Sequence, residues 1–160
     1  MAASTTVMVG NTHIDPPEIV GGCRIITLPK IADVRGNLSF VEGGRHIPFE
    51  IRRAYWIYDV PGGASRGGHA YYKLEEFIIA ASGSFDVAVD DGSERQVVPL
   101  NRSYFGLYVP PMVWRQIENF SSNSVTLILG SLPYSGEDYL RDHEAFGRLR
   151  HEIMDRNDHA

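Results

Sequence analysis

The chain contains 160 residues, with 15 basic, 20 acidic and 6 histidine side chains, and its formal net charge is -5. This length fits one domain with a substantial core, and the 43% hydrophobic and 22% charged content excludes a disordered chain. The negative charge argues against nucleic-acid binding, and every apolar run is shorter than the ~20 residues of a membrane span. The sequence lacks a convincing signal peptide and has one cysteine, Cys23, so we expect a cytoplasmic protein without disulfides.

Residues 1–22 show little periodicity, which is typical of a flexible N-terminal arm. From Cys23 onward, short segments rich in β-branched and aromatic residues follow one another, each bounded by Gly, Pro, Asn or Asp. Nine strands are predicted, at residues 23–29, 36–42, 51–60, 76–82, 84–90, 95–100, 105–110, 113–120 and 124–131. Asp91 and Gly92 are a hairpin signal between the fifth and sixth. This pattern predicts an all-β sandwich or barrel.

Only the C-terminal segment has a helical period. Glu137 and Asp138 suit the positive N-terminus of a helix that begins near Ser135. Side chains that recur at three- and four-residue intervals follow: Tyr139, Leu140, His143, Phe146, Leu149 and Ile153. The predicted organisation is therefore a flexible arm (1–22), a β-barrel (23–134) and a C-terminal helix and tail (135–160) within one domain.

Residues 69–83 resemble the first motif of the metal-binding cupins, with His69, Glu76 and Gly83 near the expected spacing. Tyr71 stands where the second histidine of that motif belongs, and Arg115 stands at the histidine position of the second motif, in residues 110–119. Arginine cannot coordinate a metal, and a divalent site needs several converging donors. The resemblance therefore implies a cupin fold, a double-stranded β-helix (jelly-roll) barrel, with a short C-terminal helix and no metal.

His69 and Tyr71 lie two residues apart, so on a strand they point to the same face. If that face is the barrel interior, they share it with Arg115 from another strand. A histidine that titrates near neutrality can move a proton to and from carbon. An arginine can stabilise a developing oxyanion such as an enolate.

The chain is similar to the sugar 3,4-ketoisomerases, the WxcM-like or FdtA-like group of metal-free cupins. The similarity runs from about residue 25 to 147 and is carried by residues 33–38, 47–59, 66–70, 106–115, 119–121 and 138–142. It implies conversion of dTDP-4-keto-6-deoxyglucose to a dTDP-3-keto-6-deoxyhexose, by proton transfer from C3 to C4 through an enediolate and without a cofactor. Such a product enters deoxyaminosugar synthesis for O-antigen, S-layer or other glycans. The partner implied is a dTDP-linked or UDP-linked 4-keto sugar, and the assembly a homodimer with exchanged N-terminal strands.

The same resemblance implies residue roles. His69 matches the catalytic base, Arg66 a residue near the nucleotide phosphates, and Arg35 and Arg115 two positions near the sugar. Arg53 and Tyr55 share one strand face, and we count both as substrate-binding candidates. Trp114 is a further candidate, although core packing or barrel lining is the first expectation for Trp56 and Trp114.

Tyr71 is the main departure, because the family usually has a second histidine there. With an ordinary pKa near ~10, tyrosine is a poor base, so Tyr71 is expected to reprotonate C4 or to donate a hydrogen bond to the carbonyl oxygen. Two alternatives remain open. A histidine base facing a tyrosine acid also suits a dTDP-sugar 3,5-epimerase, and a cupin that binds a nucleotide sugar without catalysis would retain the frame.

Overall fold

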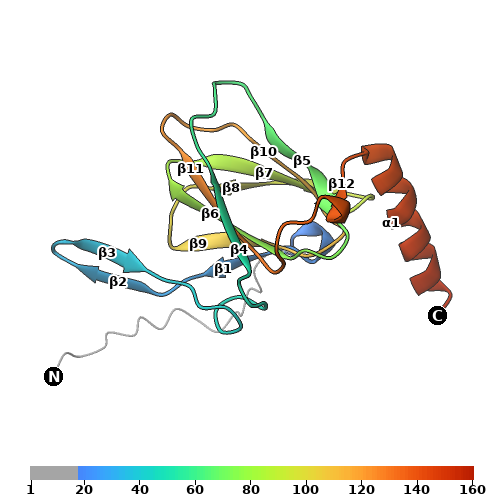
Figure 1. Cartoon of the computed structure of the whole chain (residues 1–160), viewed down its shortest axis with the longest axis horizontal. Coiled ribbons are helices and arrows are strands. Elements are labelled where there is room, and N and C mark those ends of the chain that lie inside the picture. Colours follow the sequence, from blue (N-terminus) through green and yellow to red (C-terminus); the bar gives the residue numbers. More distant parts are fainter. Residues whose placement is uncertain (1–17) are drawn as a thin grey trace, which may run out of the picture.

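The computed structural model describes residues 18–160, so the predicted arm lies largely outside the described residues. Two five-stranded antiparallel sheets form the barrel (Figure 1). The first has the order β1 (Arg24–Thr27), β9 (Phe105–Val109), β6 (Glu76–Ser82), β11 (Val125–Gly130) and β4 (Arg53–Ile57). The second has the order β12 (Tyr139–Leu140), β5 (Arg66–Tyr71), β10 (Trp114–Glu118), β7 (Phe85–Asp90) and β8 (Arg95–Leu100). This arrangement confirms the predicted all-β cupin barrel.

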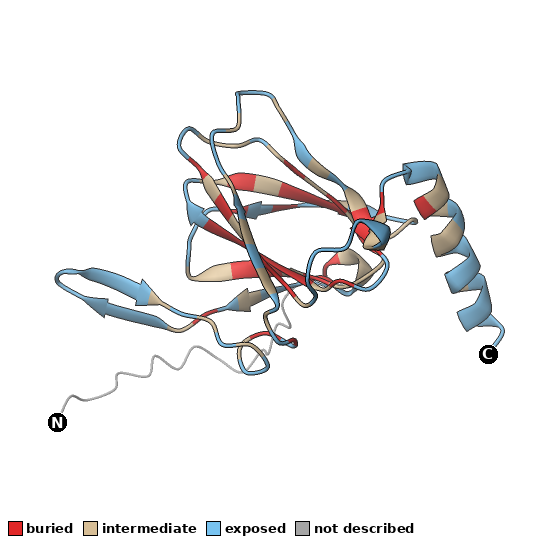
Figure 2. Cartoon of the chain, viewed as in Figure 1, coloured by how far each residue is buried: buried red, intermediate tan, exposed pale blue. Residues whose placement is uncertain are grey.

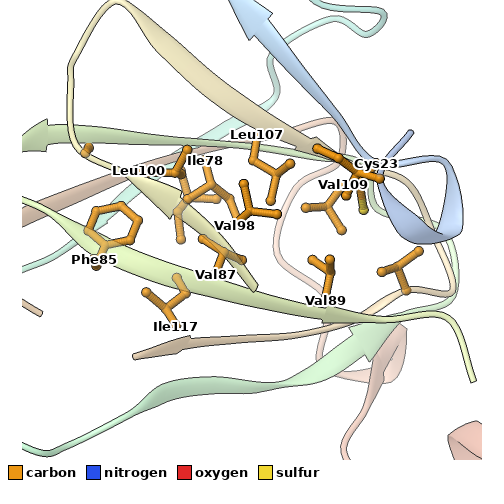
Figure 3. Packing of buried hydrophobic residues seen from close by; sticks show 14 residues of the cluster. Cys23, Ile78, Phe85, Val87, Val89, Val98, Leu100, Leu107, Val109 and Ile117 are labelled. Carbon is orange, nitrogen blue, oxygen red and sulfur yellow. The ribbon is translucent and has the colours of Figure 1, made fainter. Parts of the chain in front are cut away.

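The main core fills the space between the two sheets, with Val87, Val89 and Ile117 of the second sheet facing Ile78 and Leu107 of the first (Figure 3). These side chains are buried because each strand alternates between an interior and an exterior face. Cys23 joins the same cluster, as expected of a small apolar side chain. The hairpin predicted at Asp91 and Gly92 is confirmed, since β7 pairs with β8 across it.

A two-stranded hairpin projects from the barrel beside β1 (Figure 1). It consists of β2 (Lys30–Asp33) and β3 (Gly36–Ser39), which pair with each other and with no other strand of residues 18–160. Nearly all of it is exposed (Figure 2), including the apolar side chains of Ile31, Val34 and Leu38. The sequence assigned residues 23–134 to the barrel, but residues 30–39 of that range form a hairpin outside it.

The C-terminal helix, α1 (His143–Asp158), begins at His143 rather than near Ser135. The preceding segment is a 3-10 turn, η2 (Gly136–Asp138), followed by β12. The carboxylate of Asp138 accepts hydrogen bonds from the backbone N–H groups of Lys73 and Leu74, at 2.9 and 3.1 Å. These tertiary contacts outweigh the local helical pattern, and Asp142 caps the helix instead.

At the N-terminal side, Ile19 packs into the main core and a 3-10 turn, η1 (Val20–Gly22), leads into β1. The ordered domain therefore begins before Cys23, and β12 extends the barrel beyond residue 134. Trp56 is 60% exposed, contrary to the expected core position, because it lies on the outer face of the edge strand β4. Within residues 18–160, no helix is long and apolar enough to cross a membrane.

Candidate active site

Strand β5 carries both predicted catalytic residues, His69 and Tyr71. Its register against β10 is irregular, because Arg115 lies opposite His69 whereas Ile117 lies opposite Arg66. Three residues of β10 (115–117) thus oppose four of β5 (66–69), and the extra residue on β5 makes a β-bulge. Residues directly opposite one another in an antiparallel pair project to the same face, and Arg115 and Ile117 are both fully buried. His69 therefore faces the same interior as Arg115, whereas Arg66, at the start of the strand beyond the bulge, is exposed.

Three aromatic rings meet at this point. The centroid of the His69 ring lies 4.7 Å from that of Tyr71 and 4.8 Å from that of Tyr139, and the two tyrosine rings are 4.6 Å apart. Strand β12 places Tyr139 directly opposite Tyr71. Nε2 of His69 and the hydroxyl of Tyr71 are both buried, and neither has a hydrogen-bond partner within residues 18–160. Buried polar atoms rarely stay unpaired without a reason, and both retain unused hydrogen-bonding capacity in the interior of the barrel.

A buried ion pair lies behind these rings. Arg115 donates from Nε and Nη2 to the two carboxylate oxygens of Glu76, at 2.7 and 2.8 Å. The hydroxyl of Tyr55 donates to the same carboxylate at 2.6 Å and accepts from Nη2 at 2.9 Å. Arg115 and Glu76 are each 1% exposed. Adjacent strand residues face opposite sides, and of Glu75 and Glu76 it is Glu76 that is buried.

Gly67 completes the support of the guanidinium. Its carbonyl oxygen accepts from Nη1 of Arg115 at 3.0 Å. Its φ of 74° is in the left-handed region that favours glycine, and a Cβ at this position would overlap Nη1. Arg115 therefore donates four hydrogen bonds to protein groups, out of the five that its guanidinium can make. It has little capacity left for a ligand.

Arg53 is the opposite case. Its Nε and Nη2 are buried, and they have no hydrogen-bond partner in the described part of the chain. The guanidinium lies 5.2 Å from the ring centre of Tyr55 and 5.7 Å from that of Tyr134. A second cation, Arg141, lies 4.2 Å from the ring centre of Tyr139. The cluster thus carries positive charge, and one cation retains unused donors.

Burial and charge set the protonation states. Burial lowers the pKa of His69 to about 3, and the neighbouring Arg115 acts in the same direction. Burial raises the pKa of Tyr71 far above its usual range, with the charge of Glu76 adding to the effect. Burial alone would raise the pKa of Glu76, but Arg115 holds it below its usual value. At neutral pH the cluster therefore contains a neutral imidazole, a protonated phenol and a carboxylate.

The donors that a metal needs are not assembled here. Residues 18–160 contain no group of three or more His, Cys, Asp or Glu side chains that could hold a metal ion. Glu76 matches a metal-ligand position of the cupins, but its carboxylate forms an ion pair with Arg115. An arginine at the centre of the cluster does not fit a divalent cation.

Comparison with known proteins places this cluster in a family. The sequence model of the family described as FdtA: WxcM-like, C-terminal, matches residues 21–151. The chain belongs to this family. It is 41% identical over 123 residues to the TDP-4-oxo-6-deoxy-alpha-D-glucose-3,4-oxoisomerase of Aneurinibacillus thermoaerophilus, covering 77% of this chain and 88% of that protein.

Solved structures agree with this assignment. QdtA, a sugar 3,4-ketoisomerase from Thermoanaerobacterium thermosaccharolyticum in complex with TDP, has a TM-score of 0.82 at 32% identity, covering 84% of this chain and 98% of that chain. The WlaRB TDP-quinovose 3,4-ketoisomerase from Campylobacter jejuni has a TM-score of 0.77 at 38% identity, covering 81% and 99%.

Not every residue that the WxcM-like resemblance singles out joins the cluster. Trp114 alternates with Arg115 on β10, so its ring lies on the outer face, 5.7 Å from Phe146 and 4.8 Å from His143. The structure therefore gives Trp114 a packing position under α1 instead of a place beside His69. Arg35 stands at the end of the projecting hairpin, paired with Asp33 at 2.7 Å, and its side chain is 86% exposed. Within one chain it does not reach the cluster.

Arg66 lies at the start of β5, on the rim of a pocket of about 330 Å³. The exposed rings of Trp56 and Tyr58 line the same pocket. A guanidinium beside two aromatic rings is suited to a phosphate and a flat base. Trp56, expected in the core, is instead placed where a ligand could contact it.

Sequence reasoning missed Tyr139 and Arg141 as site residues, because it assigned Tyr139 to a helix. Both lie within a segment that resembles the family, residues 138–142, and this was the signal available. Glu76 was considered only as a metal-ligand match and as an interior residue. Its pairing with Arg115 joins positions far apart in the sequence, which no local pattern reports.

The low pKa of His69 gives a test by stability. The unfolded chain has an ordinary histidine pKa near ~6.5, so as the pH falls below that value the unfolded state binds a proton before the folded state does. Folding stability should therefore fall between pH ~6.5 and the folded pKa of about 3. His69→Gln should remove this contribution, so its melting temperature drops less between pH 7.5 and 5.0 than that of the wild type.

The control for this experiment is His151→Gln, which changes an exposed histidine on α1. It should retain the wild-type pH dependence of the melting temperature. Parallel curves for the wild type and His69→Gln would contradict the neutral, buried state of His69.

Proposed function

We propose that the chain is a sugar-nucleotide 3,4-ketoisomerase that converts dTDP-4-keto-6-deoxyglucose to a dTDP-3-keto-6-deoxyhexose. The observation that carries this proposal is the pair of unpaired, buried polar atoms on β5, Nε2 of neutral His69 and the hydroxyl of Tyr71, in a chain of the WxcM-like family. TDP-sugar isomerases are among its relatives, and one of them is 41% identical. An isomerisation of this kind moves two hydrogens within the substrate, from C3 and its oxygen to C4 and its oxygen, so atoms and electrons balance without a cofactor.

In this reaction His69 is the base. The C4 ketone makes the proton on C3 acidic, and neutral Nε2 accepts that proton as the enediolate forms. The hydroxyl proton passes from the oxygen on C3 to the oxygen on C4, and protonation at C4 then leaves the ketone at C3 and a hydroxyl at C4. A positioned general base contributes ~10²–10⁴-fold to such a step.

Tyr71 serves as a hydrogen-bond donor. Its raised pKa keeps the phenol protonated, and its hydroxyl has no partner within the described residues. The C4 carbonyl oxygen of the sugar would accept that hydrogen bond. The proton on C3 would become more acidic as a result. The hydroxyl is thus suited to the oxygen that gains charge in the enediolate.

Arg53 is the cation best placed to meet the enediolate oxygens. Arg115, which the sequence favoured for this task, is already neutralised by Glu76. Arg53 has a buried Nε and Nη2 with no partner in residues 18–160. An anion that accepts from both would satisfy them. Arg115 would then contact the sugar at most through its remaining donor.

The nucleotide would occupy the pocket beside Arg66. The phosphates would lie on its guanidinium and the base against Trp56 or Tyr58, which line that pocket. Arg66 and His69 are three positions apart on β5, which corresponds to a span of up to ~10 Å. This leaves room for the sugar between the diphosphate and the base at His69.

A homodimer with exchanged N-terminal strands would complete the site. The projecting hairpin exposes Ile31, Val34 and Leu38 to solvent in a single chain, and apolar side chains gathered in this way are typical of an interaction surface. Arg35 at its end lies away from its own cluster. A second copy would cover the hairpin and receive Arg35 near its sugar, as the family resemblance requires.

The cellular setting of the proposal follows from the reaction. Its product supplies deoxyaminosugars for O-antigen, S-layer or other glycans, made in the cytoplasm from a dTDP-linked or UDP-linked 4-keto-6-deoxyhexose. By the family resemblance, Arg35 and Arg115 match the two positions that vary with the configuration at C4. This chain has arginine at both, so NMR of the product would assign that configuration.

The nearest competing reaction is 3,5-epimerisation. The two reactions separate when the enzyme works in deuterium oxide. A 3-keto product labelled at C4 supports isomerisation, whereas label at C5 with the ketone retained at C4 supports an epimerase.

His69→Asn tests the base. Asparagine keeps a polar side chain of similar reach but cannot accept the proton, so turnover of dTDP-4-keto-6-deoxyglucose should fall by ~10²–10⁴-fold. Calorimetric binding of dTDP should be nearly unchanged, because the nucleotide would bind near Arg66. Proton NMR of the incubated substrate measures the turnover. Undiminished turnover would remove His69 from the mechanism, and binding without product in the wild type would favour a non-catalytic cupin.

Complementation tests the shared site. Arg35→Ala should lower turnover at least ~tenfold, since losing a hydrogen bond to a charged group costs ~1.5–3 kcal/mol. Co-expression of differently tagged Arg35→Ala and His69→Asn chains yields hybrid dimers, in which one barrel has His69 and receives an intact Arg35 from its partner. Such hybrids should recover about half of the wild-type turnover per dimer. Inactive hybrids would show that Arg35 does not act across the dimer.

A further inference from the structure

Glu76 is a buried carboxylate that the reaction outlined above does not use. It lies at the start of β6, in the middle of the first sheet, and its side chain points into the barrel. Its two oxygens accept three hydrogen bonds, two from Arg115 of the second sheet and one from Tyr55 of β4. It therefore joins the two sheets directly behind His69, because Arg115 is the residue opposite His69 on the neighbouring strand.

The ion pair is a poor device for stability alone. Removing two charges from water costs several kcal/mol per ion, and well-packed apolar residues often replace such pairs at no loss. The surroundings of this pair are the interior of a barrel filled mostly with aliphatic side chains, where replacement of that kind is available. A role beside the reacting groups is the better explanation.

The charge of the base changes during the reaction. When neutral His69 accepts a proton it becomes a cation, and the cations nearest to it are Arg115 on β10, Arg53 on β4 and Arg141 after β12. Glu76 is the negative side chain that faces it from β6. The remaining titratable groups that contact its ring are the phenols of Tyr71 and Tyr139. Without Glu76, the imidazolium would form beside arginines that no protein charge compensates.

We propose that Glu76 is a positioning residue for the isomerisation: it fixes the guanidinium of Arg115 through two hydrogen bonds and supplies the negative charge that His69 requires when it takes the proton. The inference rests on the proposed function, since it concerns the base of that reaction. Glu76 acts through Arg115 and through charge, without contact to the substrate. It also keeps Arg115 turned toward Gly67 and Tyr55, which leaves Arg53 as the cation with free donors.

The test is Glu76→Gln, which retains the shape of the side chain and one acceptor but removes the charge. With TDP-4-keto-6-deoxyglucose, kcat should fall roughly tenfold or more, the factor that one pKa unit represents, while KM stays near the wild-type value. The acid limb of the kcat–pH profile should move to lower pH, because the charge that favours the imidazolium is gone. A role confined to folding would lower the active fraction without moving that limb.

Glu75→Gln is the matched control. Glu75 is the adjacent residue on the chain, and its carboxylate accepts from the hydroxyl of Tyr108 at 2.7 Å, away from His69. This variant should retain the wild-type kcat and the wild-type acid limb. A shift as large as that of Glu76→Gln would overturn the inference, because it would reflect overall charge instead of the buried pair.

A second pair of variants tests the inference from the side of Arg115, and its double variant leaves no lone buried charge, so it should fold if Glu76→Gln does not. Arg115→Met leaves the lone negative charge near His69, and Glu76→Gln with Arg115→Met removes both charges. The acid limb should lie at higher pH in the single variant than in the double variant. Superimposed profiles would overturn the role of Glu76. A wild-type protein that does not isomerise the 4-keto sugar would instead overturn the proposed function, so the two failures are distinguishable.

Discussion

The paired charges of Arg115 and Glu76 are the constraint on which the centre of the barrel depends. Each is almost fully buried, and their hydrogen bonds join the first sheet to the second where the core turns from aliphatic to polar. A lone charge at either position would be strongly destabilising, which makes the two residues necessary to one another. Gly67 belongs to the same unit, because only a residue without a Cβ leaves room for the guanidinium. Gly67 also lies within the bulge of β5, so the bulge beside His69 and the ion pair are in direct contact.

The division of labour among the arginines follows from this constraint. Composition alone offers thirteen candidates and no means of choosing between them. Hydrogen bonding separates them by function: Arg115 is satisfied by protein groups, whereas Arg53 keeps Nε and Nη2 unpaired in the described region. A guanidinium whose charge and donors are already paired with protein groups supports the structure. A buried guanidinium with unpaired donors can bind an anion. In the proposed reaction, Arg53 donates hydrogen bonds to the enediolate oxygens.

The sequence was sufficient for the barrel and for the face that His69 and Tyr71 share, because alternation and turn residues report both. It did not predict β5 as a strand, since Arg66, Gly67 and Gly68 lack β-type side chains and the strand forms through pairing with β10. It placed Tyr139 on a helix, because the three- and four-residue spacing is real but Asp138 is held by the backbone of Lys73 and Leu74. The inward position of Arg115 and the outward position of Trp114 were within reach, because adjacent strand residues alternate. The pairing of residues far apart in the sequence, such as Arg115 with Glu76, could not be predicted from local patterns.

The tyrosine at position 71 limits which residue can carry the proton from C3 to C4 in the proposed reaction. Releasing a proton from this phenol would leave a phenolate that is shielded from water and near the carboxylate of Glu76, and the raised pKa of Tyr71 expresses that cost. His69 pays no such penalty when it returns its proton, because the neutral imidazole is its favoured state at this position. A single base that removes the proton from C3 and delivers it to C4 must remain on one face of the sugar for both steps. The replacement of a second histidine by tyrosine is therefore compatible with catalysis, provided that the hydroxyl only holds the oxygen while His69 carries the proton.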